Sequence, residues 1–134
     1  MLPREMHVLA VEDDEVDVVA LRRAFARRGL QDRLQVVTDS LEALALMRAG
    51  LPWPYLLLLD LALPRMSGLE LLGLLRQDPS LAALPVYFLT TSRQPREVLQ
   101  AQQLGVRAFL NKEEMGSDYG PLFALLAADG HLEG

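Results

Sequence analysis

Five polar residues of this chain carry carboxylate, hydroxyl or ammonium groups that can take part in reactions or bind ions, and they follow short apolar segments. Glu12 and Asp13 follow HVLAV, Asp60 follows YLLLL, Thr90 follows PVYFL, and Lys112 follows RAFLN. Carboxylates that lie close together repel one another and stay ionised together only beside a cation. Oxygen ligation of this kind suits Mg²⁺, which prefers one or two carboxylates, several waters and a substrate phosphate oxygen.

The same residue types could support transfer of a phosphoryl group. A carboxylate can attack phosphorus and form an acyl phosphate. The oxygens of the transferring group carry negative charge, which a metal ion, a lysine ammonium and a hydroxyl donor would stabilise. The residues therefore predict an aspartate that accepts a phosphoryl group, provided that the fold brings the five side chains together.

Short apolar runs alternate along the chain with segments of helical periodicity. The runs predict five strands, at residues 7–11, 34–38, 55–59, 85–89 and 107–111. The helical segments end at Gly29 and at Gly50, follow a capping box of Ser67 and Glu70, and lie around residues 95–104 and 121–128. This alternation with short connections predicts a parallel sheet with helices on both faces.

The predicted architecture is a flavodoxin-like (βα)5 three-layer sandwich with strand order 2-1-3-4-5. In open α/β sheets, ligands bind beyond the carboxyl ends of the strands, where the strand order reverses. The first and third strands are neighbours at that point, so Glu12, Asp13 and Asp60 are expected to converge. Thr90 and Lys112 would stand along the other side of the same pocket.

Length and composition narrow the class of protein. With 134 residues, the expectation is a single domain over residues 1–134, with a core at about 6–128 and no output domain. The net charge of −5 argues against nucleic-acid binding, and the lack of cysteine excludes thiolate catalysis and zinc–sulfur sites. No apolar run approaches the ~20 residues of a membrane span, so we expect a cytoplasmic protein without membrane contact.

The motifs VEDD, LLLLDLALPRMSG, PVYFLTTS and AFLNK occur in this order. Together they resemble the receiver domain of response regulators in two-component signalling, over nearly the whole chain. The segments VEDDEVD, LPRMSG and LTTS are most similar to stand-alone regulators that accompany bacterial phytochrome-type sensor kinases. The resemblance implies a sensor histidine kinase as partner, and a signal passed on by protein contact or onward phosphotransfer rather than by catalysis on separate substrates.

The resemblance also implies a metal site around the phosphoacceptor. Asp60 would accept the phosphoryl group. Glu12 and Asp13 would hold Mg²⁺ together with Asp60, and Ala62 would supply a backbone carbonyl to the same ion.

Further roles follow from the same resemblance. Thr90 would hydrogen-bond the phosphoryl group and shift on phosphorylation, while Lys112 would pair with a phosphoryl oxygen. Phe109 would be the switch aromatic that moves with Thr90. Pro64 and Gly68 would shape the loop after the phosphoacceptor.

The chain departs from the family pattern at four positions. Glu113 replaces the usual proline after Lys112, and a trans peptide bond is expected because a cis bond before a residue other than proline costs ~3 kcal/mol. Ala62 occupies a position where a polar side chain is common, and that side chain helps to set the lifetime of the phosphoryl group. Ser67 replaces a common acid, and Phe109 replaces a frequent tyrosine.

The residues assigned to the phosphoryl-transfer site, and Phe109, also have purely structural interpretations. Glu12, Asp13 and Asp14 could form the acidic first turn of a helix. Asp60 and Lys112 could be a structural ion pair. Phe109 could be an ordinary core residue.

Three further residues carry secondary predictions. Asp17 could be a polar contact beneath the acidic pocket or only a first-turn acid, and both alternatives stay open. Ser92 is expected to cap the next helix. Phe123 points away from the apolar face of the last helix, and it motivates the hypothesis of a homodimer through the fourth helix, fifth strand and fifth helix.

Three other functions fit the sequence less well. A receiver-like adaptor that works without phosphorylation is disfavoured by the complete set of acids, threonine and lysine. An aspartate-nucleophile phosphohydrolase typically needs an acid two residues after the nucleophile, where this chain has Ala62. A flavodoxin-like cofactor binder would need a glycine-rich phosphate loop after the first strand, where this chain is acidic.

Overall fold

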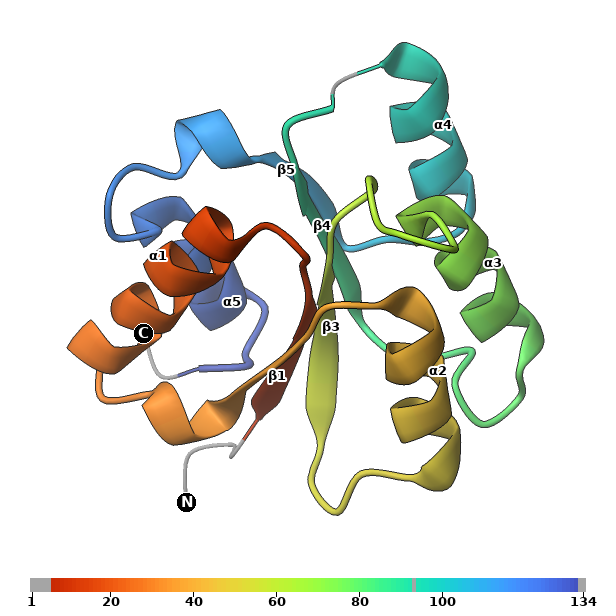
Figure 1. Ribbon diagram of the computed structural model, residues 1–134, viewed down its shortest axis with the longest axis horizontal. Coiled ribbons are helices and arrows are strands. Elements are labelled where there is room, and N and C mark those ends of the chain that lie inside the picture. Colours follow the sequence, from red (N-terminus) through yellow and green to blue (C-terminus); the bar gives the residue numbers. More distant parts are fainter. Residues whose placement is uncertain (1–5, 93, 133–134) are drawn as a thin grey trace.

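The core of the protein is a five-stranded parallel sheet. The computed structural model describes residues 6–92 and 94–132. Its strands are β1 (His7–Val11), β2 (Leu34–Val37), β3 (Tyr55–Leu59), β4 (Val86–Thr90) and β5 (Ala108–Asn111). Their order is β2-β1-β3-β4-β5, which confirms the predicted flavodoxin-like topology (Figure 1). β1 and β3 are therefore neighbours at the point where the strand order reverses.

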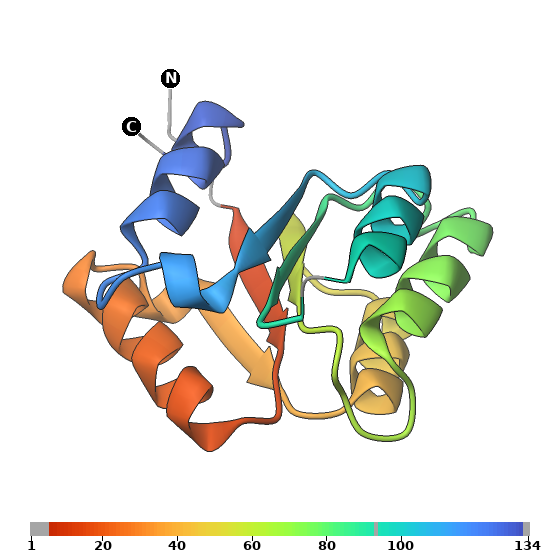
Figure 2. The ribbon, with the colours of Figure 1, turned by 90° about the horizontal axis from the view of Figure 1, so that it is seen from above.

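The helices form the two outer layers of a three-layer sandwich. They are α1 (Glu15–Arg27), α2 (Ser40–Ala49), α3 (Gly68–Gln77), α4 (Pro95–Gln103) and α5 (Gly120–Ala128). Figure 2 shows α1 and α5 on one face of the sheet and α2, α3 and α4 on the other. Short 3₁₀ turns, η1 (Gln31–Arg33) and η2 (Lys112–Glu114), lie between α1 and β2 and between β5 and α5.

Successive side chains of a strand point to opposite faces of the sheet, so each strand supplies apolar residues to both layers of the core. In β1, Leu9 and Val11 pack on the side of α2, α3 and α4, whereas Val8 and Ala10 pack on the side of α1 and α5. Residues 56–59 of β3 are all buried, because this strand is covered on both faces. The continuous apolar runs of the sequence are thus explained by a sheet enclosed between two layers of helices.

Polar side chains lie at the helix starts that border the site, but they act as caps at α3 and not at α4. Ser67 and Glu70 form the predicted capping box at the start of α3. The prediction for Ser92 is wrong, because α4 begins after Gln94, which makes no side-chain cap. The hydroxyl of Ser92 instead donates a hydrogen bond to the carboxylate of Glu97 within the first turn of α4.

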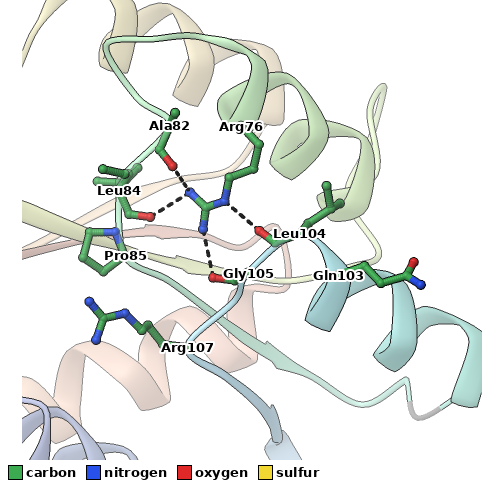
Figure 3. Close-up of a pocket in the computed structure, with 9 residues that line it drawn as sticks. Arg76, Ala82, Leu84, Pro85, Gln103, Leu104, Gly105 and Arg107 are labelled. Atoms are coloured by element: carbon green, nitrogen blue, oxygen red, sulfur yellow. Dashed lines mark hydrogen bonds between the residues drawn. The ribbon is translucent and has the colours of Figure 1, made fainter.

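Arg76, near the end of α3, ties together three segments at the amino ends of β4 and β5 (Figure 3). Its Nε donates to the carbonyl of Leu104 at 2.7 Å, and its terminal nitrogens donate to the carbonyls of Leu84, Ala82 and Gly105 at 2.9–3.2 Å. The guanidinium lies in a surface hollow of about 450 Å³. Four of its five N–H donors are used on backbone carbonyls, so this hollow is a structural junction.

The orientation of Phe123 differs from the prediction. Its side chain is only 6% exposed. The ring contacts Phe25 of α1 edge to face, with centroids 4.9 Å apart, and the guanidinium of Arg28 lies 4.1 Å from its centroid. Phe123 therefore belongs to the core between α1 and α5, and it offers no surface for a dimer.

Candidate functional site

The acidic residues after β1 and β3 meet at the carboxyl edge of the sheet. Val11 lies opposite Leu59 at the ends of these strands. The N–H of Asp60 donates to the carbonyl of Val11 at 3.2 Å, and the N–H of Glu12 donates to the carbonyl of Val37 at 3.0 Å. Backbone pairing thus continues one residue past the strands and carries both carboxylates to the same place.

Glu12, Asp13 and Asp60 form one cluster, as the sequence predicted. One carboxylate oxygen from each lies within 4.8 Å of the others. Glu12 and Asp60 are 6% and 7% exposed, whereas Asp13 is open to solvent. Clustered carboxylates with one open side suit a hard divalent cation that keeps some of its waters.

Asp14 has a different role from its two acidic neighbours. It is the N-cap of α1, and its side chain accepts hydrogen bonds from the N–H groups of Val16 and Asp17. Glu12 and Asp13 precede the helix. The structural alternative of an acidic first turn therefore does not explain their positions.

Lys112 brings a cation to the same cluster. Its Nζ lies 2.5 Å from Glu12 Oε1, 2.7 Å from Asp17 Oδ2 and 2.9 Å from Asp60 Oδ2. The residue begins η2 directly after β5, and the described chain, which includes the Lys112–Glu113 bond, has no cis peptide. Both the inward direction of Lys112 and the trans bond before Glu113 agree with the prediction.

Burial and pairing shift the pKa values of two residues in the cluster. Burial raises the pKa of Glu12 from 4.5 to about 7, against the opposing effect of its hydrogen bond to Lys112. Burial alone would lower the pKa of Lys112, but hydrogen bonds to Asp17, Glu12 and Asp60 outweigh it and raise that pKa. The lysine is therefore a fixed positive charge, while Glu12 titrates near neutral pH.

Thr90 is the last residue of β4, and Phe109 lies within the neighbouring strand β5. Thr90 is 1% exposed, and its register partner is Asn111, the residue before Lys112. Its hydroxyl accepts a hydrogen bond from the N–H of Ser92 at 3.2 Å. Phe109 is half-buried, with its ring centroid 5.6 Å from that of Phe88. The switching roles of both residues stay predictions.

The loop after Asp60 is shaped by close backbone contacts. The N–H of Gly68 donates to the carbonyl of Leu61 at 2.9 Å, and a side chain at position 68 would overlap the carbonyl oxygen of Asp60. The N–H of Met66 bonds the carbonyl of Pro64 at 2.8 Å, which makes a tight turn around Arg65. The expected importance of Gly68 for this loop thus has a steric basis, whereas the contact made by Pro64 uses only its backbone carbonyl.

Asp39, the N-cap of α2, and Ser40, the first residue of this helix, hold the same loop. The buried hydroxyl of Ser40 donates to the carbonyl of Met66 at 2.7 Å, and Arg65 pairs with Asp39 at 3.0 Å. Ala62 lies in this loop with its side chain exposed. Its backbone carbonyl as a metal ligand stays a prediction.

Asp17 is the residue that sequence analysis left undecided. Its carboxylate contacts Lys112, 95 positions further along the chain. The position of Asp17 on the inner stripe of α1 was the available signal, but only the fold identifies its partner. Asp17 is thus a polar contact within the acidic site.

Comparison with known proteins places this geometry in a family. The family model of the response regulator receiver domain matches residues 8–118. The chain belongs to this family. Receiver domains of this kind occur in two-component response regulators.

Individual proteins similar to this chain are also response regulators. The receiver domain is 33% identical over 110 residues to the response regulator Rcp1 of Synechocystis sp.. The aligned region covers 78% of this chain and 75% of Rcp1. The crystal structure of Mn²⁺-bound Rcp1 superposes with a TM-score of 0.80 at 27% identity, covering 95% and 98% of the two chains. The phosphorylated cyanobacterial phytochrome response regulator RcpA gives a TM-score of 0.82 at 26% identity, covering 98% and 99%.

Within residues 6–92 and 94–132, each helix is too short or too polar to traverse a bilayer.

Proposed function

We propose that this receiver domain accepts a phosphoryl group on Asp60 in a reaction that depends on Mg²⁺. One observation carries the proposal: the ammonium of Lys112 lies 2.9 Å from Asp60 at a cluster of three carboxylates. A carboxylate oxygen of Asp60 forms a bond to phosphorus, and the bond from phosphorus to the donor atom breaks. Glu12, Asp13 and Asp60 would hold Mg²⁺, which when bound would stabilise the charge on the phosphoryl oxygens.

The remaining residues of the site have parts in this proposal. Lys112 binds a phosphoryl oxygen, and the backbone carbonyl of Ala62 would be a further ligand of the metal. Thr90 turns toward the phosphoryl group, and Phe109 follows it. A covalent anion at Asp60 then biases a two-state surface around α4, β5 and α5.

The phosphodonor we propose is the phosphohistidine of a sensor histidine kinase, in particular one of the phytochrome type. Similarity to Rcp1 and to the phytochrome response regulator RcpA supports this choice. The signal passes to a protein partner or by onward phosphotransfer in the cytoplasm. The domain assists its own phosphorylation and dephosphorylation and acts on no separate substrate.

The experiment is an intact-mass measurement after incubation with acetyl phosphate and Mg²⁺. Wild type should gain one phosphoryl group in the presence of Mg²⁺ and none when EDTA replaces Mg²⁺ in the incubation. Asp60→Asn should gain none in either case. An adduct on both proteins would place the acceptor elsewhere. No adduct on either protein, with acetyl phosphate or with a phosphorylated kinase, would favour the adaptor that works without phosphorylation.

We also propose a homodimer through the face formed by α4, β5 and α5. Its support is apolar surface on α4: Leu99 is 54% exposed, and it lines a hollow of about 380 Å³ with Val98 and Phe109. Light scattering at tens of micromolar should show a dimer for the phosphorylated protein and a monomer for phosphorylated Leu99→Arg. A monomer for phosphorylated wild type would reject the dimer.

A further inference from the structure

Asp17 has no part in the chemistry proposed above, yet it touches the central cation of the site. We propose that Asp17 is a positioning residue that keeps the ammonium of Lys112 in place while the other partners of Lys112 change. This inference rests on the proposed function of Asp60. It assigns to α1 a direct part in the phosphoryl-transfer site.

The ammonium of Lys112 has its full complement of acceptors. A lysine ammonium has three N–H donors. Its acceptors here are the carboxylates of Asp17, Glu12 and Asp60, and the side chain of Lys112 is only 9% exposed. A phosphoryl oxygen can therefore bind Lys112 only if one of these three carboxylates gives up its hydrogen bond.

Two of the three acceptors change during the reaction. Glu12 and Asp60 belong to the carboxylate cluster that could hold a metal ion, whereas Asp17 does not. Asp60 also loses its negative charge when its oxygen becomes part of an acyl phosphate. Asp17 is thus the one partner of Lys112 whose charge and surroundings stay the same through the cycle.

The backbone around Asp17 suits such an anchor. The residue lies in the first turn of α1, and its N–H donates to the N-cap carboxylate of Asp14 at 3.2 Å. Lys112, in contrast, begins a short 3₁₀ turn and reaches the site through a flexible four-carbon stem. A fixed carboxylate on a helix can therefore orient a mobile ammonium and preserve the direction of its remaining N–H groups.

The expected consequence is a slower reaction with unchanged metal binding. Asp17→Asn keeps the shape of the side chain but removes its charge, which weakens the hydrogen bond to Lys112. The rate constant for phosphorylation by acetyl phosphate should fall about tenfold. The dissociation constant for Mg²⁺ should stay within about twofold, because Asp17 lies outside the carboxylate cluster.

The experiment compares wild type, Asp17→Asn, Asp17→Glu and Glu15→Gln, with rates measured by intact mass. Glu15 is an exposed acid in the same first turn of α1, so Glu15→Gln removes an equal charge without touching Lys112. Asp17→Glu restores a carboxylate and should recover part of the lost rate, which a merely structural defect would not do. Urea unfolding of each variant keeps a loss of folded protein from being counted as a loss of rate.

The outcomes separate the two proposals. If wild type itself gains no phosphoryl group, the proposed function fails. If wild type is phosphorylated and Asp17→Asn reacts within about twofold of it, the inference about Asp17 is overturned and the function stands. Equal losses in Asp17→Asn and Glu15→Gln would also overturn it, because they would show an effect of helix charge alone.

Discussion

Gly68 lies with its backbone against the carbonyl of Asp60, so closely that any side chain at position 68 would overlap that oxygen. The same added carbon would lie 2.9 Å from the ring of Phe88. The start of α3 is thus packed directly on the backbone of the proposed phosphoacceptor.

This contact predicts that Gly68→Ala both destabilises the protein and slows phosphorylation. Either α3 or the backbone of Asp60 must move to admit the methyl group, and overpacking of this kind costs about 1–3 kcal/mol. The free energy of unfolding in urea and the rate of phosphorylation by acetyl phosphate are the measurements.

Gly73 provides a matched control on the same helix. A carbon added there would meet nothing within 4 Å. Gly73→Ala should therefore stabilise the protein by about 0.5–1 kcal/mol through helix propensity, and it should leave the phosphorylation rate unchanged. Equal losses of stability in the two variants would contradict the steric explanation.

The sheet and the acidic cluster could be predicted because their signals are local. Apolar runs ending in polar residues mark the strands, and parallel strands place their carboxyl ends at one edge. Glu12 and Asp60 need only this regularity to meet. The capping box of Ser67 and Glu70 is local for the same reason.

The features that sequence analysis missed depend on distant contacts. The pairing of Asp17 with Lys112 joins α1 to the end of β5. Phe123 is buried because Phe25 and Arg28 of α1 cover it, although it lies off the inner stripe of its own helix. The cap assigned to Ser92 failed for a local reason: the helix after β4 starts at Pro95, near the predicted position, and the hydroxyl of Ser92 donates to Glu97 instead of capping it.

The hydrogen bonds of Arg76 predict that its replacement destabilises the protein, most of all at the end of α4. Arg76→Met removes hydrogen bonds to the carbonyls of Leu84, Leu104 and Gly105, among others, and should lower the free energy of unfolding by about 2 kcal/mol. Amide hydrogen exchange in the last turn of α4 should become faster. Arg76→Lys should restore only part of the loss, since an ammonium cannot reach all of these carbonyls at once.

The control for Arg76 is Arg96→Met on α4. Arg96 is exposed, so its replacement should change stability by less than about 0.5 kcal/mol. Similar losses from both variants would show that charge, and not the bonded junction, accounts for the effect.

The burial of Phe123 predicts a stability effect without an effect on association. Phe123→Ala should cost about 3–5 kcal/mol in urea unfolding, because it leaves a cavity beside Phe25. Leu99→Ala, at an exposed position, should cost less than about 0.5 kcal/mol. If the Phe123→Ala protein kept its stability and lost only the ability to dimerise, that result would contradict the placement of this ring in the core.

The raised pKa of Glu12 predicts that Mg²⁺ binding weakens as the pH falls. Burial brings this pKa from 4.5 to about 7, so the metal-free site holds a proton at pH 6 that the metal must displace. Because the folded pKa lies above the ordinary one, the contribution of Glu12 to stability is present below pH 4.5 and is lost as the pH rises through about 7. Between pH 8 and pH 6, the apparent affinity for Mg²⁺ should fall about tenfold in titration calorimetry, with proton release seen in buffers of different ionisation enthalpy. Glu12→Gln cannot titrate and should bind Mg²⁺ more weakly but equally at both pH values. A wild-type affinity that does not change with pH would contradict the raised pKa of Glu12, and the same pH dependence in Glu12→Gln would show that another group holds the proton.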